Sequence, residues 1–339
     1  MQYSLGLASR GAGHVAPNPM VGAVVVVEDR IIGEGWHQQF GGAHAEVNAL
    51  NAVKPEDVHL LPQATLFVTL EPCNHFGKTP PCTEKIIASG VKKVVIGSLD
   101  PNPLVAGKGV ERLRDTGIEV FTGVLETECR HLNRFFFTFH EKKRPYITLK
   151  WAQSADGFIA GEGGKPIHFT NAACDQLVHK LRAEHMGILV GGNTVITDNP
   201  RLTTRLWPGK NPTRIIIDTK NNLPTDAHIF NDEAPTVIFN FLENKTVNQH
   251  TYIQIPATNY LPALLTQLHH LQINSVLVEG GTKTLQQFID ERMYDEIIYF
   301  ESKQPIQKGI KGPVVEGSFT TTELDGVWVH QPQLTKSAE

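Results

Sequence analysis

The chain has 339 residues, of which 40% are hydrophobic and 19% are charged, and its formal net charge is −4. This length exceeds the roughly 100–200 residues of a typical single domain, so the sequence predicts two domains, each with enough apolar residues to fill a core. The slight acidic excess and a pI near 6.4 argue against a broad nucleic-acid-binding surface, which needs clustered lysines and arginines.

No apolar run approaches the roughly 18 residues of a membrane-spanning helix, and the first residues lack the basic and apolar segments of a secretory signal. We therefore expect a cytoplasmic protein. Four cysteines, Cys73, Cys82, Cys129 and Cys174, are too few and too unevenly spaced for a disulfide framework in a chain of this length. The first two belong to a motif described below, and we expect the other two to be buried thiols.

In the first half of the chain, short β-branched runs alternate with helical patterns. VGAVVVV at 21–27 is bounded by turn signals and, with the following IIGEGWH, predicts a β-hairpin. The other expected elements here are strands at 64–70, 91–100 and 117–124 and helices at 43–53 and 83–90. This alternation predicts a sheet covered by helices.

A charged, proline-containing stretch, FHEKKRPYITLK, separates the two halves, and we place the boundary near Lys143 to Pro145. Beyond it the same alternation returns. The expected strands are at 146–152, 187–190, 213–218, 235–240, 275–279 and 295–300, and the clearest helices are at 171–185 and 282–291. The sequence thus predicts two α/β domains, at 1–143 and 146–335.

The strongest chemical signal is AHAEV, followed further along the chain by EPCNHFGKTPPC. Catalytic zinc usually takes three protein ligands and leaves one position for water, and His44, Cys73 and Cys82 supply such a set. Cys82 also opens a predicted helix, whose N-terminus favours the thiolate that metals require. Glu46, two residues after His44, is placed to carry a proton without binding the metal.

His-x-Glu followed by Pro-Cys-x-x-Cys is typical of zinc deaminases of nucleobases. Here eight residues separate Cys73 and Cys82 instead of two. The insertion, NHFGKTPP, is polar and rich in turn-forming residues, so it predicts either a loop that borders the substrate or a plain solvated loop. Within it, Lys78 is a candidate partner for a phosphate.

EPCNHFGKTPPC, together with PNPMVGAVVV, GEGWH and DPNPLVAGKG, resembles the deaminase half of the bifunctional riboflavin-biosynthesis deaminase/reductase family. The long insertion between the cysteines distinguishes this family from cytidine and tRNA-adenosine deaminases. The resemblance implies a cytidine-deaminase-like α/β/α fold for 1–143 and, as substrate, a diaminopyrimidinone that bears a ribosylamino 5′-phosphate. The residues that the resemblance implies for holding this substrate are Asn18, His37, His75, Lys78, Asp100 and Asn102.

The second half carries a weaker signal from its residues alone. GILVGGNTV and SVLVEGGTKTLQQF each run from an apolar strand through two glycines toward a helix. Glycines let the backbone approach a ligand, and free N–H groups at a helix start attract phosphate. Without a GxGxxG or Walker motif, GGTKT is either a pyrophosphate-binding loop or a tight turn. Lys150, in KWAQSADG, would lie near the strand ends where α/β proteins place their sites.

KWAQSADG, LRAEHMGILVGGNTVITDNPRLTTR, TRIIIDTK and SVLVEGGTKTL resemble the reductase domain of the same family, which is similar to dihydrofolate reductase in fold and uses NADPH. The resemblance implies that 146–335 reduces a ribosyl group to a ribityl chain, with Lys150 as a catalytic candidate. The residues implied to face the ribose phosphate are Lys150, Arg182, Leu202, Arg205 and Glu279. Those implied to face the cofactor are Ala152, Thr194, Asp198, Thr219, Gly280, Gly281, Thr282, Lys283, Thr284 and Leu285.

One segment departs from this family. Many members have a Ser-x-Trp sequence where this chain has KPIHFTN, so that Pro166 and His168 stand there and His168 becomes the candidate cofactor contact. Two alternatives stay open: a zinc deaminase of another nucleobase or nucleoside, and a second half that binds a nucleotide without catalysis. The partners that we expect are a pyrimidine ribosyl phosphate and a second copy of the chain, with neither nucleic acid nor membrane.

Overall fold

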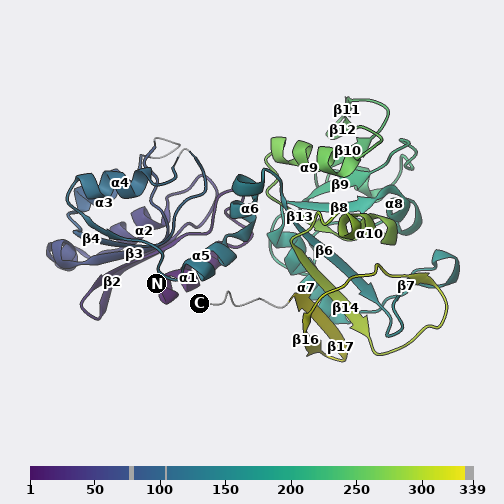
Figure 1. The fold of residues 1–339 in the computed structure, drawn as a ribbon, viewed down its shortest axis with the longest axis horizontal. Coiled ribbons are helices and arrows are strands. Elements are labelled where there is room, and N and C mark those ends of the chain that lie inside the picture. The colour runs from purple at the N-terminus through teal and green to yellow at the C-terminus, as the bar shows by residue number, and fades with distance from the viewer. Residues whose placement is uncertain (76–79, 104, 333–339) are drawn as a thin grey trace. The chain divides into compact units, whose positions relative to one another are not determined.

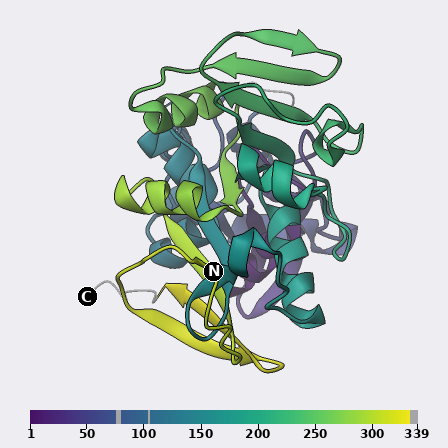
Figure 2. The same ribbon diagram turned by 90° about the vertical axis from the view of Figure 1, so that its right-hand side faces the viewer.

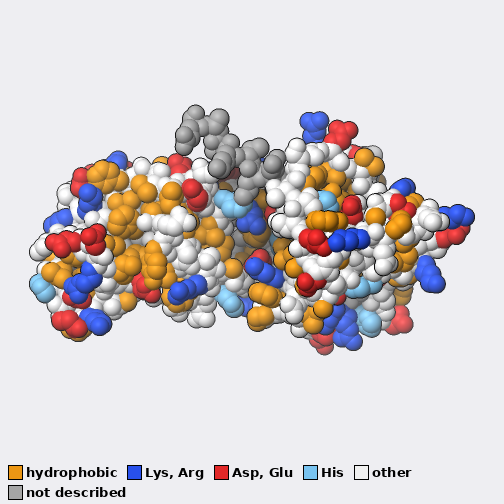
Figure 3. All heavy atoms as spheres, turned by 90° about the horizontal axis from the view of Figure 1, so that it is seen from below, with side chains coloured by type: hydrophobic (Ala, Val, Ile, Leu, Met, Phe, Trp, Pro, Cys, Tyr) orange, Lys and Arg blue, Asp and Glu red, His pale blue; other side chains and the backbone are white. Residues whose placement is uncertain are grey.

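The computed structural model describes residues 1–75, 80–103 and 105–332. The chain forms two compact units, Met1–Lys143 and Arg144–Glu339, and each unit contains its own sheet (Figures 1 and 2). Within the described residues, no helix is long and apolar enough to cross a membrane. On the face drawn in Figure 3, basic and acidic side chains are interspersed, as the balance of 31 Lys and Arg against 35 Asp and Glu leads one to expect.

The first unit is built on a five-stranded mixed sheet with the order β2-β1-β3-β4-β5. Its strands are β1 (Gly22–Val27), β2 (Arg30–Trp36), β3 (Thr65–Leu70), β4 (Lys93–Ser98) and β5 (Glu119–Phe121). The hairpin of β1 and β2 is antiparallel, as the sequence predicts, and β1 is also antiparallel to β3. The strands β3, β4 and β5 run parallel.

Helices cover both faces of this sheet (Figure 1). The helices of the unit are α1 (Gln2–Ala8), α2 (Ala45–Asn51), α3 (Cys82–Ser89), α4 (Lys108–Asp115), α5 (Glu126–Leu132) and α6 (Arg134–Lys142), with 3-10 turns η1 (Ser9–Gly11) and η2 (Pro55–Gln63). On one face, α2, α3 and α4 contribute to the main apolar core. On the other, α1 and α5 lie so close to the strands that a Cβ at Gly22 would meet Ser4 O of α1 at 2.0 Å and one at Gly97 would meet Cys129 Sγ of α5 at 2.3 Å.

The second unit is built on a ten-stranded sheet with the order β11-β12-β10-β9-β8-β13-β6-β14-β17-β16. These strands are β6 (Tyr146–Gln153), β8 (Gly187–Gly191), β9 (Thr213–Ile217), β10 (Thr236–Asn240), β11 (Lys245–Val247), β12 (His250–Gln254), β13 (Ser275–Val278), β14 (Glu296–Ser302), β16 (Phe319–Leu324) and β17 (Val327–Pro332). Strands from β12 to β14 are parallel, and antiparallel strands close both edges. A separate pair joins β7 (Phe158–Ala160) to β15 (Ile310–Lys311).

The parallel strands are buried on both faces, which explains their continuous apolar runs. One face packs against α9 (Tyr260–His270) and α10 (Thr282–Asp290). The other packs against α7 (Ala172–Glu184) and α8 (Gly192–Asp198). Two 3-10 turns, η3 (Glu162–Gly164) and η4 (His228–Phe230), complete the unit. The predicted class of two successive α/β folds is confirmed.

Candidate active sites

Three metal-binding side chains converge at the end of β3 in the first unit. His44 is the N-cap of α2, Cys73 follows β3, and Cys82 is the first residue of α3. Their donor atoms all lie within 4.8 Å of one another. His44 Nδ1 is 3.6 Å from Cys73 Sγ and 3.2 Å from Cys82 Sγ, close to the spacing of about 3.5 Å that bonds of about 2.0–2.3 Å to a tetrahedral zinc produce. One nitrogen and two sulfurs therefore fit zinc, with a fourth position left for water.

A hydrogen bond between the two thiols shifts their pKa values in opposite directions. The pKa of Cys73 is lowered to about 4, first by a hydrogen bond from the Cys82 thiol and further by His44. The pKa of Cys82 is raised, chiefly by the same hydrogen bond and by burial. The backbone N–H of Cys82 also donates to Cys73 Sγ at 3.4 Å. A thiolate is thus already favoured at Cys73, and a divalent cation would take the place of the thiol proton.

Glu46 lies in the first turn of α2, and only 3% of the residue is exposed. Burial raises the pKa of its carboxyl to about 7, whereas the nearby His44 acts in the opposite direction. A carboxyl that titrates near neutrality can both take up and release a proton. The geometry therefore suits a proton carrier beside the metal ligands.

These residues open onto a cavity of about 300 Å³. Besides His44, Glu46 and Cys73, the structure places there the residues that the sequence implies for substrate binding, namely Asn18, His37, His75, Asp100 and Asn102. Lys78, also expected there, lies outside the described residues.

Asn18 and His37 form a pair at one wall of this cavity. The amide Nδ2 of Asn18 lies 3.3 Å from His37 Nε2, and His37 Nδ1 lies 3.1 Å from the carbonyl oxygen of Ala43. Burial lowers the pKa of His37, so the neutral imidazole donates to Ala43 and accepts from Asn18. This orientation leaves the amide oxygen of Asn18 available to a ligand.

Sequence reasoning missed several residues that line the same cavity. Glu71, which lies between β3 and Pro72, contributes a buried carboxylate, and Phe40 and Phe136 contribute apolar walls. The signal for Glu71 was present, because a lone carboxylate directly after a buried strand is expensive unless it is fully hydrogen-bonded. Phe136 also packs in an apolar cluster with Leu70 and Phe137.

The second unit has a cavity of about 740 Å³ at the carboxyl ends of its parallel strands. Of the residues that the sequence implies for this half, the cavity is lined by Lys150, Ala152, Thr194, Asp198, Thr219, Glu279, Gly280, Gly281, Thr282, Lys283, Thr284 and Leu285. Lys220, Asp218 and Phe169 also line it and were not foreseen. Arg182, Leu202, Arg205 and His168 are not among its lining residues.

Two helices begin at the wall of this cavity without a side-chain cap. Gly191 and Gly281 are the N-caps of α8 and α10, and neither helix start is capped by a side chain. A Cβ at Gly191 would meet Thr284 Oγ1 at 2.8 Å, and one at Gly281 would meet Thr194 Oγ1 at 3.3 Å. The absence of a Cβ at both positions therefore leaves room between the two helix starts. Free N–H groups at helix starts bind phosphate, which fits the pyrophosphate of NADPH.

Lys150, Arg182 and Glu279 form a buried charge cluster beside the cavity. Glu279 accepts hydrogen bonds from Arg182 Nε and Nη2, both at 2.7 Å, and lies 3.8 Å from Lys150 Nζ. Although burial raises the pKa of Glu279, the two cations lower it to about 2. Burial lowers the pKa of Lys150, opposed by Glu279. The cluster holds one negative charge between two positive ones, an excess that suits an anionic ligand.

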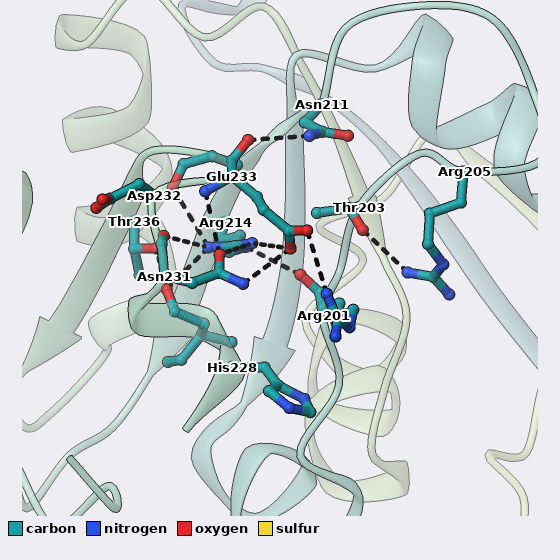
Figure 4. Close-up of polar contacts among 12 residues, drawn as sticks. Arg201, Thr203, Arg205, Asn211, Arg214, His228, Asn231, Asp232, Glu233 and Thr236 are labelled. Atoms are coloured by element: carbon teal, nitrogen blue, oxygen red, sulfur yellow. Dashed lines mark hydrogen bonds and ion pairs between the residues drawn. The ribbon is translucent and has the colours of Figure 1, made fainter. Parts of the chain in front are cut away.

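The segment 199–205 carries two of the predicted substrate residues and has no regular secondary structure. Polar side chains fix it instead (Figure 4). Arg182 Nη1 donates to Thr203 O at 3.2 Å, and the backbone N–H of Arg205 donates to His179 Nδ1 at 2.9 Å. Arg205 Nη1 in turn donates to Thr203 Oγ1 at 2.9 Å. Leu202, in contrast, is buried in an apolar core cluster, so its side chain serves packing.

Arg214 of β9 holds the same segment from the other side and is fully buried. Its Nε donates to Arg201 O at 3.0 Å, and its other nitrogens donate to the carbonyl oxygens of Ile229, Asn231 and Ala234 and to Asn231 Oδ1 (Figure 4). Glu233 lies 3.6 Å away and also pairs with Arg201 at 3.2 Å. A single charged residue inside the apolar run TRIIID was the sequence signal for this buried network.

His168 is not among the residues that line the cavity. Its Nε2 lies 3.4 Å from Asp175 Oδ2 and 3.3 Å from Thr170 Oγ1, and 68% of the side chain is exposed. Its neighbours Ile167 and Phe169 line the cavity instead. In the segment KPIHFTN, the residues that contact the cavity thus include the apolar neighbours of His168 on both sides and not His168 itself.

Both halves of the chain match known families. Residues 1–98 match the cytidine and deoxycytidylate deaminase zinc-binding region, and residues 145–303 match the RibD C-terminal domain. Riboflavin biosynthesis protein RibD of Aquifex aeolicus is 45% identical over 316 residues, which cover 91% of this chain and 88% of that protein. RibD of Escherichia coli is 35% identical over 330 residues, covering 92% of this chain and 89% of that protein.

Solved structures agree over the whole length. A diaminohydroxyphosphoribosylaminopyrimidine deaminase/5-amino-6-(5-phosphoribosylamino)uracil reductase of Thermotoga maritima is 40% identical, with a TM-score of 0.88 and coverage of 98% of this chain and 96% of that one. RibD of Acinetobacter baumannii is 33% identical, with a TM-score of 0.87 and coverage of 97% and 96%. This chain, which has a zinc-binding deaminase region and an NADPH-using reductase region, belongs to the RibD family of riboflavin biosynthesis proteins.

Proposed function

We infer that the chain is a bifunctional enzyme of riboflavin biosynthesis that deaminates a diaminopyrimidinone ribosylamino 5′-phosphate and then reduces its ribosyl group to a ribityl chain. The observation that carries this function is the presence of two candidate sites in one chain, a His-Cys-Cys donor set beside a buried carboxyl and a glycine-walled cavity beside a buried lysine. We assign the deaminase to residues 1–143 and the reductase to residues 146–335.

In the deaminase, zinc held by His44, Cys73 and Cys82 supplies a Lewis acid that makes water nucleophilic near neutral pH. Glu46 takes a proton from the attacking water and returns it to the departing amino group, which leaves as ammonia. The amide of Asn18, oriented by His37, is placed to bind the pyrimidine ring.

In the reductase, bound NADPH supplies the hydride that reduces C1′ of the opened ribosyl group. The free N–H groups at the starts of α8 and α10 bind and orient the cofactor's phosphates. Arg182 and Arg205 are the candidates for the substrate phosphate, because a guanidinium fork matches phosphate oxygens. Lys150, held by Glu279, lies where it can contact the ribose.

The remaining expectations stay part of this proposal. A cytoplasmic location is supported by the biosynthetic role and by the use of NADPH, and the sequence-based prediction of a homo-oligomer that binds no nucleic acid stays a prediction. A second half that binds a nucleotide without catalysis is not favoured, because residues 145–303 match the C-terminal domain of the RibD family.

The decisive experiment is a single-tube assay of the zinc-loaded chain with the diaminopyrimidinone ribosylamino phosphate and NADPH, in which ammonia release and NADPH oxidation are followed together. Ammonia release followed by NADPH oxidation is the expected result. Ammonia release alone would mean that the second half binds without turnover, and the absence of both signals would point to another substrate.

A further inference from the structure

Glu71 joins two loops of the deaminase cavity. It follows β3 and precedes Pro72 and the metal ligand Cys73, so its backbone belongs to the ligand-bearing loop. Only 4% of Glu71 is exposed, and it lines the cavity. A buried carboxylate needs hydrogen-bond partners in proportion to its charge, and the partners of Glu71 all come from the loop on the opposite side.

Each oxygen of this carboxylate accepts two backbone N–H groups. Oε2 accepts from Asp100 at 3.2 Å and from Gly107 at 2.9 Å, and Oε1 accepts from Gly109 at 2.9 Å and from Val110 at 3.2 Å. The carboxylate therefore holds both the start of the DPNP loop and the first turn of α4. Because N–H donors to an ionised acceptor form stronger hydrogen bonds than neutral pairs, these four fix the loop firmly.

The position of Asp100 in turn affects that of Asn102, the next predicted substrate-binding residue. The backbone N–H of Asn102 donates to Asp100 Oδ1 at 2.8 Å, so the turn at this point is built on the residue that Glu71 fixes. Asp100 and Asn102 both line the cavity. A shift of Asp100 away from Glu71 would therefore carry Asn102 with it.

A glycine keeps the two loops in contact. A Cβ at Gly109 would meet the carbonyl oxygen of Pro72 at 2.1 Å and Glu71 Oε1 at 3.1 Å. The backbone of α4 at Gly109 thus lies directly against that of Pro72, at the same residue whose N–H donates to Glu71 Oε1.

We propose that Glu71 is a positioning residue for deamination, whose carboxylate fixes the substrate-holding Asp100 at its place beside Cys73. This inference rests on the proposed deaminase activity. It assigns to Glu71 neither metal binding nor proton transfer, and so it predicts an effect on substrate binding rather than on zinc content.

The test is Glu71→Gln in the full-length, zinc-loaded chain, with the diaminopyrimidinone ribosylamino phosphate as substrate. Glutamine keeps the shape but turns an NH₂ group toward two of the four N–H groups, which leaves them unpaired and releases the loop. We expect KM for deamination to rise about tenfold or more, kcat to fall by less than about threefold, and zinc to stay bound. Reduction of the deaminated intermediate, assayed separately in the same chain, should not change.

A second variant tests the same contact from the opposite side. Gly109→Ala leaves the carboxylate intact but forces the start of α4 away from Pro72, and it should reproduce the rise in KM. Glu111→Gln is the matched control, because it makes the same chemical change on an exposed position of α4. It should leave both kinetic constants within about twofold of wild type, as most surface substitutions do.

Failure of the positioning role and failure of the proposed deaminase activity give different results. An unchanged KM in Glu71→Gln, or a loss of zinc with the loss of activity, would overturn the positioning role. If Glu71→Gln does not fold, Gly109→Ala decides, and an unchanged KM there overturns the proposal. A wild-type chain that releases no ammonia would instead refute the proposed function itself.

Discussion

The carboxylate of Glu279 and the guanidinium of Arg182 form a two-bond ion pair inside the second unit, with both N–O distances at 2.7 Å and about a tenth of each side chain exposed (8% and 13%). Such a pair gains little over apolar packing, but the loss of one partner leaves a buried charge without compensation. This relationship links the stability of the unit to its predicted substrate site.

Acid should weaken the contribution of Glu279 to the stability of the second unit. Since the pKa of Glu279 is about 2 in the fold and about 4.5 ordinarily, its stabilisation is complete above pH 4.5 and is lost as pH falls toward 2. This difference in pKa corresponds to a contribution of about 3 kcal/mol to the free energy of unfolding. We expect the free energy of unfolding, measured by denaturant titration at several pH values, to fall less steeply with acid in Glu279→Gln than in wild type. Equal slopes would contradict the prediction.

Glu46→Gln should retain zinc and lose ammonia release by a factor of about 10²–10⁴, because Glu46 is proposed to carry protons and not to bind the metal. Zinc content and ammonia release are measured on the same preparation. Glu56→Gln, an exposed carboxylate of η2, serves as the control. Loss of zinc in Glu46→Gln would show that the carboxylate holds the site together instead.

Lys150→Ala should weaken reduction while it spares deamination, since Lys150 lines only the cavity of the second unit. Reductase kcat/KM should fall by at least about tenfold, the effect of losing one buried charged contact. The exposed Lys245, which pairs with Glu243, provides the control variant Lys245→Ala. Equal damage to both activities by Lys150→Ala would contradict two separate sites.

Arg214→Met should destabilise the second unit by more than about 3 kcal/mol, because several buried carbonyl oxygens lose their donor at once. Glu233→Gln is a milder comparison: 41% of the Glu233 side chain is exposed to solvent, so the loss of its pair with Arg214 should destabilise the unit far less than Arg214→Met does. Calorimetric unfolding of both variants provides the measurement. A small effect of Arg214→Met would mean that water can replace the guanidinium.

Cofactor affinity should distinguish His168 from Phe169. Because His168 does not line the cavity and 68% of its side chain is exposed, His168→Ala should change the Kd for NADPH by less than about twofold. Phe169 is buried and lines the cavity, so Phe169→Ala should raise that Kd by about tenfold through lost apolar contact. A stronger effect at His168 would instead support the sequence-based prediction that this residue contacts the cofactor.

Much of the core was predictable because burial leaves a periodic signature. The β1–β2 hairpin, the strands at 187–191 and 213–217 and the helix at 172–184 differ from their predicted bounds by one or two residues. The helices α1, α5 and α6 escaped prediction because they are short and their mixed sequences have no clear period. Their positions depend on close contacts such as that between Gly97 and Cys129, which join residues far apart in the chain.

The metal-binding set was predictable for a different reason: one histidine and two cysteines, in this order along the chain, are residue types that themselves bind zinc. For Arg214 and Glu71 the sequence shows only that a charged residue lies in or beside a buried strand; their partners were not predictable, because these are mostly backbone groups, which the sequence does not distinguish from one another. The neighbours of His168 show the same limit, since which of three adjacent side chains faces a cavity depends on backbone dihedral angles.

The division between Lys143 and Arg144 has a consequence for how much of each catalyst a cell makes. Each sheet takes all its strands from one side of this point, and so do the residues that line each described cavity. No described sheet or cavity is therefore built from residues on both sides of this peptide bond. What the bond does impose is stoichiometry, because one round of translation yields one copy of each catalyst, and successive reactions receive equal catalyst numbers without separate regulation of two genes.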